Sequence, residues 1–482
     1  MAFLSQNAWA GLWSVMLQWS RIGLNAAVFI VLSRWIGLSD IGAVAAAQAP
    51  VLMFQSAFVA AVPESVVQER EPSEIKLASY FWMSVIVGLA SSILLLCLGP
   101  TFTRLVGEPE VLPFFQALSA GPLILSIACV HEGLLRKSLN MRFLAVRTTI
   151  ASSIAGTASI ILALRGFEGW AMVAFILVNS ITSTTLTLVS HPWRPAFVID
   201  LNFLKGIGPK LGAIVGRYWL SSITTPLIQL VATAQLGLAT GGTLQLAFRL
   251  QTLLSALVVA PLRFIALPLF ARVQGNSEAL RRGIVRAISA GSCIASPVYV
   301  GMLAVAPDLL PLLLGQSNGG PTVELFRLIS VYGPFEIPVS IVNQALVAGG
   351  MATVVFRRTI AIYFLVIIPC VVAAFHSAFL VCIVYSVGAS FFGLTLSAWL
   401  ARKYYSVNSV EFLVAFARPL VAALFMWLGI EAMHSVLSSL PASERIVILI
   451  AFGGMSYPVL LFLIARPQMM ALWSLLTGRK AE

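Results

Sequence analysis

The chain has 482 residues and a net charge of +12, and 59% of its residues are hydrophobic whereas only 10% are charged. A soluble domain carries about 25% charged residues, so this composition excludes an ordinary soluble protein. The basic excess is explained by membrane topology and by anionic lipid, and it does not indicate nucleic-acid binding.

Apolar stretches long enough to cross a bilayer recur from one end of the chain to the other. A helix needs about 20 such residues to cross roughly 30 Å of hydrocarbon, and we expect about fourteen spans. Lipid offers no partners to backbone polar groups, and the stretches do not alternate as barrel strands do. We therefore predict an all-α polytopic membrane protein. The expected spans are 12–34, 40–62, 78–98, 112–132, 145–164, 168–190, 209–236, 244–270, 285–307, 324–348, 359–375, 377–400, 412–434 and 444–465.

Basic residues between the spans predict the orientation. With a cytoplasmic N-terminus, the inner segments hold roughly twenty Lys and Arg residues and the outer segments about five, which is the bias expected of cytoplasmic loops. This asymmetry places both termini in the cytoplasm. The inner residues are Arg136, Lys137, Arg142, Arg147, Arg194, Lys205, Lys210, Arg272, Arg281, Arg282, Arg286, Arg357, Arg358, Arg402, Lys403, Arg466, Arg479 and Lys480.

Four arginines lie inside apolar stretches: Arg21, Arg217, Arg249 and Arg263. An ionised guanidinium at the bilayer centre costs from about 2.5 to more than 10 kcal/mol, so each should face a bundle interior or a wet cavity. Counted along the helices, Arg21, Arg217 and Arg263 lie roughly 12–14 Å from the cytoplasmic side, and Arg249 lies in the outer half. The four arginines predict a basic cluster that binds an anionic cargo.

The structural alternative is that these arginines pair with carboxylates inside the spans. Glu336 and Glu431 are the main candidates, and two carboxylates cannot neutralise four arginines. Glu336 is a candidate for ion coupling, although a hydrogen bond between helices explains it equally well. Gln48 and Gln55 lie on one face of a helix, where they would bind sugar hydroxyls or join helices. No cysteine motif indicates a metal or a disulfide, and no catalytic residues are predicted.

Two short motifs indicate an internal repeat. GLSDIG (Gly37–Gly42) is matched by GLATGG (Gly237–Gly242), and LSAGP at residues 118–122 is echoed by ISVYGP at residues 329–334. With six spans and a cytoplasmic start in each half, the repeats would be parallel, and two further spans follow them. The predicted domains are an N-terminal lobe at 1–205, a C-terminal lobe at 206–405, and two extra helices with a tail at 406–482.

A family resemblance is carried by an ordered series of segments over roughly residues 5–350: LSRWIGLSDIGAVAAAQA, VPESVVQEREPSEIKLASYFWMSV, HEGLLRKSLNMRFLAVRTTIASSIAG, LGLATGGTLQLAFRLQTLL and PLRFIALPLFARVQ. The series resembles the Wzx-type flippases, the polysaccharide transporters of the multidrug/oligosaccharidyl-lipid/polysaccharide superfamily. The resemblance implies two six-helix lobes in a V-shaped arrangement that work by alternating access. Arg21 and Arg249 look similar to cavity arginines of the related lipid II flippases. One departure is Ala234, because the family often has a basic residue three positions before the glycine of this turn.

The cargo implied by the resemblance is an oligosaccharide on undecaprenyl diphosphate. It would be moved across a bacterial inner membrane for exopolysaccharide, capsule or O-antigen synthesis. Arginine forks suit the diphosphate of such a cargo. Further expected partners are membrane lipids, with a polysaccharide polymerase and chain-length machinery as candidates. No cofactor is expected, and coupling to H+ or Na+ is left open.

Three alternative functions remain from the sequence. A lipid II flippase has a similar fold, whereas a drug or cation antiporter of the same superfamily would favour acidic cavity groups. A membrane oligosaccharide polymerase would be an enzyme, and it normally has a long periplasmic loop that this sequence lacks.

Overall fold

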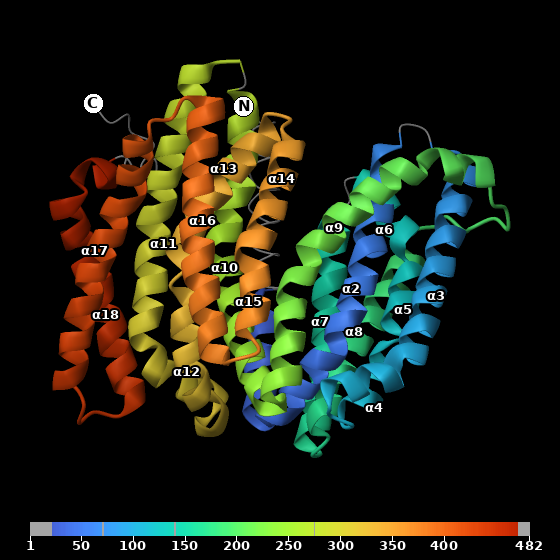
Figure 1. Ribbon diagram of the computed structural model, residues 1–482, viewed down its shortest axis with the longest axis horizontal. Helices are drawn as coiled ribbons and strands as arrows, with labels where there is room; N and C mark the ends of the chain where they lie inside the picture. Colours follow the sequence, from blue (N-terminus) through green and yellow to red (C-terminus); the bar gives the residue numbers. More distant parts are fainter. Residues whose placement is uncertain (1–21, 70–71, 139–140, 274, 471–482) are drawn as a thin grey trace. The chain divides into compact units, whose positions relative to one another are not determined.

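The computed structural model describes residues 22–69, 72–138, 141–273 and 275–470, and every element in those ranges is a helix (Figure 1). A helix at Ile22–Trp35 precedes α2. The N-terminal elements are α2 (Leu38–Gln68), α3 (Glu74–Val106), α4 (Val111–Leu118), α5 (Gly121–Ser126), α6 (Cys129–Lys137), α7 (Met141–Leu164), α8 (Glu168–Ser190) and α9 (Leu201–Leu236). The C-terminal elements are α10 (Leu238–Arg272), α11 (Ser277–Leu314), α12 (Gln316–Ser330), η1 (Gly333–Phe335), α13 (Glu336–Ala348), α14 (Ala352–Ile362), η2 (Tyr363–Ile367), α15 (Ile368–Ala373), α16 (Ala378–Tyr405), α17 (Ser409–Val436) and α18 (Ala442–Ile464).

The structure confirms an all-helical multi-pass membrane protein. In the described residues, eleven helices are long and apolar enough to cross a membrane, or up to twelve if a bent pair counts as one span. Even with the bent pair counted, two of the fourteen predicted spans are not among these twelve. The described part of the first, Ile22–Trp35, is a shorter apolar helix, and α9 overlaps the predicted span 209–236 without appearing among the eleven.

The predicted span 112–132 is broken into three short helices. Val111–Ser126 and Cys129–Lys137 meet at an angle of 44°. Two side chains of the neighbouring helix α3 bind the backbone near the break: Ser92 Oγ accepts from the Leu123 amide at 3.2 Å, and Ser84 Oγ donates to the Ser126 carbonyl at 3.1 Å. Such partners are what allow a broken helix inside a membrane protein, because lipid would leave these groups unsatisfied.

The predicted spans 359–375 and 377–400 are separated as expected. α15 ends at Ala373, and Ser377 caps α16 by accepting a hydrogen bond from the Leu380 amide at 3.1 Å. One turn before Pro369, residues 363–367 form a π-helix. Proline lacks an N–H and clashes with the preceding turn, which accounts for the local change in helix type. The first of these spans begins earlier than predicted, at Ala352.

The chain forms two compact units, residues 1–245 and residues 246–482, which we call the N-terminal and C-terminal units. The predicted lobe boundary lies between residues 205 and 206, whereas this division lies after residue 245. Most of α9 and the start of α10 therefore belong to the N-terminal unit. The reason is that α9 packs extensively along α2, and Tyr218 on α9 donates a hydrogen bond to Glu64 on α2 at 2.7 Å. A helix assigned to the second repeat by sequence therefore belongs by contact to the N-terminal unit.

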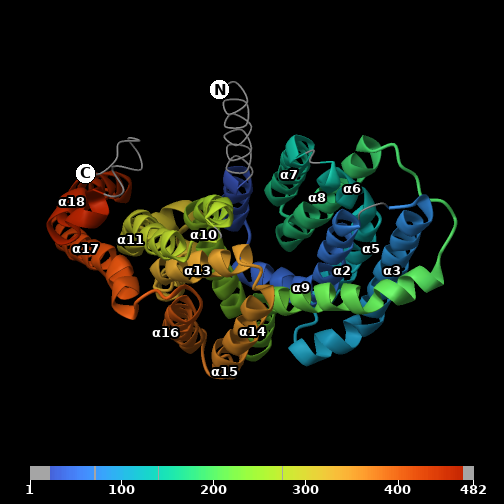
Figure 2. The same cartoon turned by 90° about the horizontal axis from the view of Figure 1, so that it is seen from above.

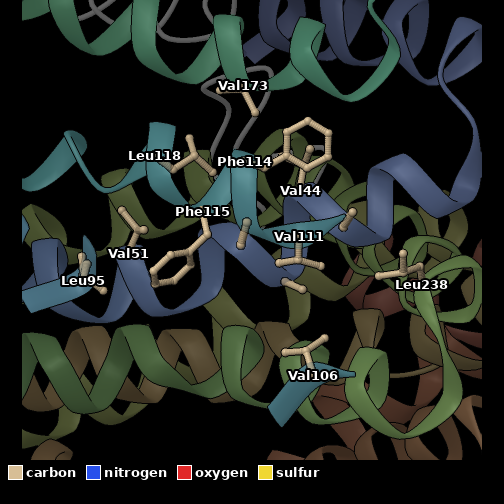
Figure 3. Packing of buried hydrophobic residues seen from close by; sticks show 13 residues of the cluster. Val44, Val51, Leu95, Val106, Val111, Phe114, Phe115, Leu118, Val173 and Leu238 are labelled. Atoms are coloured by element: carbon tan, nitrogen blue, oxygen red, sulfur yellow. The ribbon is translucent and has the colours of Figure 1, made fainter. Parts of the chain in front are cut away.

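The core of the N-terminal unit is a layer of apolar side chains from several helices (Figure 3). Val44 and Val51 of α2 lie with Leu95 of α3 and with Phe115 of α4, each 3% exposed or less. The Phe115 ring stacks on Phe102 with centroids 4.8 Å apart. Because lipid is as apolar as these side chains, their contribution comes from close packing more than from removal of water.

The two repeat glycine motifs contact each other in the N-terminal unit. A Cβ atom on Gly42 would lie 1.9 Å from the Leu238 carbonyl oxygen, and a Cβ atom on Gly242 would lie 1.9 Å from the Leu38 carbonyl oxygen. The contact is reciprocal, since each glycine meets the same backbone atom of the equivalent turn. The structure thus assigns a physical role to the repeated motif, because only glycine allows the two helix ends to approach this closely.

The segment between α8 and α9, residues 191–200, is fixed to α3. Trp193 Nε1 donates to Glu74 at 3.0 Å, Trp82 Nε1 donates to the Ala196 carbonyl at 2.8 Å, and Ser79 accepts from the Asp200 amide at 2.9 Å. At the start of this segment, burial and the neighbouring Arg194 lower the pKa of His191 from its ordinary value.

In the C-terminal unit, the last two helices pack against α11 (Figures 1 and 2). Their contact is apolar along most of its length, with Met426 and Leu449 buried in it. At one end of this contact, the apolar side chains are replaced by an ion pair. Asp308 of α11, 7% exposed, accepts from Arg445 Nε at 2.8 Å and contacts His434 Nε2 at 3.0 Å. These contacts attach helices outside the predicted repeat firmly to the unit.

Candidate functional site

The four arginines predicted to bind cargo lie in different places in the structure. Arg21 lies outside the described residues. Arg217 lies in α9 of the N-terminal unit, and its side chain is likewise outside what the structure describes. Arg249 and Arg263 both lie on α10 within the C-terminal unit, and Arg249 is partly buried. The predicted pairing of Arg21 with Arg217 stays a prediction.

Arg263 is held against α13 by two contacts. Its Nη2 forms an ion pair with Glu336 Oε1 at 2.5 Å, and its Nε donates to Ser340 Oγ at 2.6 Å. The Arg263 side chain is still 45% exposed, whereas that of Glu336 is 12% exposed. Ser255 of α10 also donates to Glu336 Oε1, at 2.8 Å. The arginine therefore has a fixed orientation and an accessible surface at once, as a residue that binds an anion requires.

Helix geometry and close packing explain the position of Glu336. It begins α13 directly after the 3-10 turn Gly333–Phe335, where the helix dipole favours a negative charge. A Cβ atom on Gly333 would lie 2.1 Å from the ring of Tyr299, so glycine at this turn lets α11 and α13 pack closely. The sequence left open ion coupling or a helix–helix hydrogen bond for Glu336, and its partners on α10 establish the contact between helices.

A second arginine in the C-terminal unit was not recognised from sequence. The prediction that Arg357 and Arg358 lie in an inner loop is wrong, because both residues lie in α14, where Arg358 is 8% exposed. Its Nη1 donates to Asn343 Oδ1 of α13 at 2.6 Å. Its neighbour Arg357 is exposed. The sequence did contain a signal for this burial. Arg358 lies in the apolar run 352–362, which leads directly into the predicted span 359–375.

Glu336, Ser340 and Asn343 share one face of α13, because their spacings of four and three residues match the helical repeat. We call these three residues the polar face of α13. Arg263 reaches it from α10 and Arg358 reaches it from α14. Two guanidinium groups thus meet one carboxylate, so the group carries an excess of positive charge inside a membrane-spanning unit.

In the N-terminal unit the predicted sugar-binding glutamines are only partly buried. Gln55 Oε1 lies 3.3 Å from the position that a Cβ atom on Gly121 would occupy, so this side chain packs between α2 and α5. A cavity of about 400 Å³ lies between α2, α3 and α9, with apolar residues such as Phe58, Met83 and Trp219 in its wall. This wall suits a hydrocarbon and does not suit a sugar.

In the described parts of the chain, no three His, Cys, Asp or Glu side chains are grouped so that they could hold a metal ion. The polar face of α13 offers instead guanidinium, hydroxyl and amide groups. Guanidinium groups donate in a planar fork that matches phosphate and carboxylate.

Comparison with known proteins decides the family. The model of the family described as "Polysaccharide biosynthesis protein" matches residues 31–318, which is more than half of the chain. The chain belongs to this family. The match includes α2 to α11 and therefore includes Arg217, Arg249 and Arg263.

Two relatives show how far the likeness extends along the chain. The Succinoglycan biosynthesis transport protein ExoT of Rhizobium meliloti (strain 1021) is 22% identical over 97% of this chain and 95% of its own length. The Lipopolysaccharide biosynthesis protein WzxC of Escherichia coli (strain K12) is 23% identical, covering 75% of this chain and 73% of its own. These matches confirm the resemblance stated from the sequence.

Solved structures show the same fold at low identity. The lipid II flippase MurJ in an inward closed conformation matches with a TM-score of 0.77 and 13% identity, covering 95% of this chain and 99% of that chain. An inward-facing multidrug resistance transporter of the MATE family matches with a TM-score of 0.64 and 15% identity over 80% of this chain and 97% of that chain. The fold is thus that of the transporter superfamily indicated by the sequence.

Proposed function

We propose that this protein is a flippase, which moves an oligosaccharide repeat unit linked to undecaprenyl diphosphate from the cytoplasmic to the periplasmic leaflet. The observation that supports this most directly is the excess of guanidinium groups at the polar face of α13. Ionised groups inside spanning segments mark a pathway, and positive charge selects an anionic cargo. Family membership supports the same cargo class, since relatives are named for polysaccharide transport and biosynthesis.

The proposed mechanism uses binding alone and has no chemical step. The lipid tail stays in the bilayer, while the diphosphate and the sugars cross through the protein. Arg263 binds the diphosphate in an orientation set by Glu336 and Ser340. Arg21 and Arg217 bind the diphosphate together in the inward-facing state, and Arg249 acts further towards the periplasm. Alternating access then follows because the cargo stabilises one conformation more than another.

Glu336 would couple transport to an ion. Arg263 is its partner in the absence of cargo. When a diphosphate takes up Arg263, the carboxylate loses part of its compensation and gains affinity for H+ or Na+. Cargo and ion would then influence each other's binding by the same factor, as linkage requires.

The proposed location is the bacterial inner membrane, with both termini in the cytoplasm. Membrane lipids surround the spans, and a polysaccharide polymerase and chain-length machinery would act on the product. The basic-residue asymmetry supports the orientation of the termini, and the names of the relatives support a role in polysaccharide biosynthesis.

Deletion of the gene tests the proposed function. Surface polysaccharide should be lost, and a lipid-linked oligosaccharide should accumulate on the cytoplasmic leaflet, where an impermeant glycosidase added from outside cannot reach it. Accumulation of lipid II would assign the protein to peptidoglycan synthesis instead. If no lipid-linked saccharide accumulates while polysaccharide export continues, the proposal is wrong.

A further inference from the structure

Among the side chains that the structure describes, each unit buries one arginine, and the two lie at matching positions. Arg147 of α7 is 7% exposed and Arg358 of α14 is 8% exposed. Each contacts a residue fifteen positions earlier in the chain, which is Glu132 of α6 for Arg147 and Asn343 of α13 for Arg358. The same separation in both units indicates equivalent places in the repeat.

The two arginines differ in how their charge is compensated. Arg147 Nη1 lies 3.5 Å from the Glu132 carboxylate, which also pairs with Arg136 at 2.5 Å, and it donates to Thr187 Oγ1 at 2.7 Å. Arg358 donates to an amide oxygen, and none of the described carboxylates pairs with it. The Nε atoms of both arginines are buried without a hydrogen-bond partner among the described residues, so the two sites differ in the carboxylate and not in this atom. A buried charge is costly unless it is paired, and an amide dipole cannot neutralise a guanidinium.

The position of Arg358 suggests how its charge is used. Asn343, which it contacts, is three residues from Ser340, which Arg263 contacts. Three residues correspond to about 4.5 Å along the helix axis, so the two arginines reach α13 less than one turn apart. Arg263 is 45% exposed. An anion that reaches Arg263 is therefore within one helical turn of the uncompensated Arg358.

We propose that Arg263 and Arg358 form an oxyanion site on the polar face of α13 and that the ligand is a phosphate or diphosphate group. Asn343 keeps the site available, because its amide orients Arg358 without neutralising the positive charge. At the equivalent place in the N-terminal unit, the carboxylate of Glu132 partly neutralises Arg147. The source of the phosphate is the cargo, in which case the inference rests on the proposed function, or the headgroup of an anionic phospholipid.

The decisive variant is Asn343→Glu, which gives Arg358 the acidic partner that Arg147 has. It should fold at least as well as the unmodified protein while neutralising the site. Arg358→Gln removes the charge directly, and Arg357→Gln is the matched control because Arg357 is adjacent and exposed. The full-length protein, purified in a phosphate-free maltoside detergent, is titrated with inorganic pyrophosphate by calorimetry.

A charge-assisted hydrogen bond is typically worth a factor of ten or more in affinity. We expect Asn343→Glu and Arg358→Gln each to weaken pyrophosphate binding at least about tenfold, with Arg357→Gln within about twofold. If Arg358→Gln does not fold, Asn343→Glu alone decides the result. Folded Asn343→Glu protein that binds pyrophosphate as tightly as the unmodified protein would overturn the proposal, as would a protein that binds no pyrophosphate in any form.

Two further arms identify the source of the phosphate. The first arm measures thermal stability in nanodiscs with and without phosphatidylglycerol. If phosphatidylglycerol stabilises the unmodified protein but not Asn343→Glu, and if Asn343→Glu still exports polysaccharide normally, the phosphate is that of a lipid headgroup. Loss of export by Asn343→Glu at normal protein level, without any such lipid effect, assigns the cargo. Either result supports the site. The pyrophosphate titration does not depend on what is exported, so failure of the proposed function and failure of the site are distinguishable.

Discussion

The close approach of the two repeated glycine turns gives the sharpest prediction about the fold. In Gly42→Ala, the new methyl group would lie 1.9 Å from the Leu238 carbonyl oxygen, where real Cβ atoms stay beyond 3.0 Å. The obstacle is backbone, so no side-chain rotation relieves the clash. The two helix ends must separate by more than an ångström, and Gly242→Ala has the same effect from the other side.

The magnitude follows from overpacking. Forcing a methyl group into a closely packed site typically costs about 1–3 kcal/mol, and a backbone obstacle places this substitution at the upper end. At about 2 °C per kcal/mol for a large domain, each variant should lower the midpoint of thermal unfolding by on the order of 5 °C. Once one substitution has separated the helices, the second should cost less, so the double variant should be less destabilised than the sum of the two.

The assay is thermal unfolding of the purified protein in one detergent, together with polysaccharide export. Gly454→Ala is the control, because it lies in a helix and a Cβ atom there would meet nothing within 4 Å. It should unfold no earlier than the unmodified protein, since alanine favours helix over glycine by about 1 kcal/mol. Gly42→Ala and Gly242→Ala variants with unchanged midpoints and normal export would refute this account of the repeated motif.

Three other predictions address topology, the last two helices and the cargo. A single cysteine near residue 140 should react with an impermeant thiol reagent only after the cells are opened, and labelling of intact cells would contradict the predicted orientation. Asp308→Asn should lower the unfolding midpoint markedly, because breaking a buried ion pair with Arg445 costs about 3–5 kcal/mol; an unchanged midpoint would show that the pair is not needed. Arg21→Ala and Arg217→Ala should each abolish most export at normal protein level, and normal export would exclude the proposed diphosphate contact.

Conservative variants serve as controls for two of these. Glu444→Gln removes an exposed carboxylate from the same helix as Arg445, so it should leave the unfolding midpoint unchanged. Arg217→Lys keeps the charge and loses the two-pronged contact with phosphate, so its export should be intermediate.

The class of the protein follows from its sequence alone, because the cost of exposing polar backbone to lipid leaves only a few possible structures. Hydropathy located most of the spans, and the turn at His376–Ser377 was found where it was expected. The glycine motifs at Gly42 and Gly242 identified the repeat. These are local properties, since each depends on residues close together in the chain.

Tertiary structure decided how the charged groups are partnered. Arg263 and Glu336 are 73 residues apart, and no local pattern predicts that α10 and α13 bring them together. The burial of Arg358 followed from a helix that begins at Ala352, earlier than hydropathy indicated. The division at residue 245 likewise reflects the packing of α9 on α2. Each of these features depends on which helix faces meet, and hydropathy, which treats all faces of a buried helix alike, carries no information about that choice.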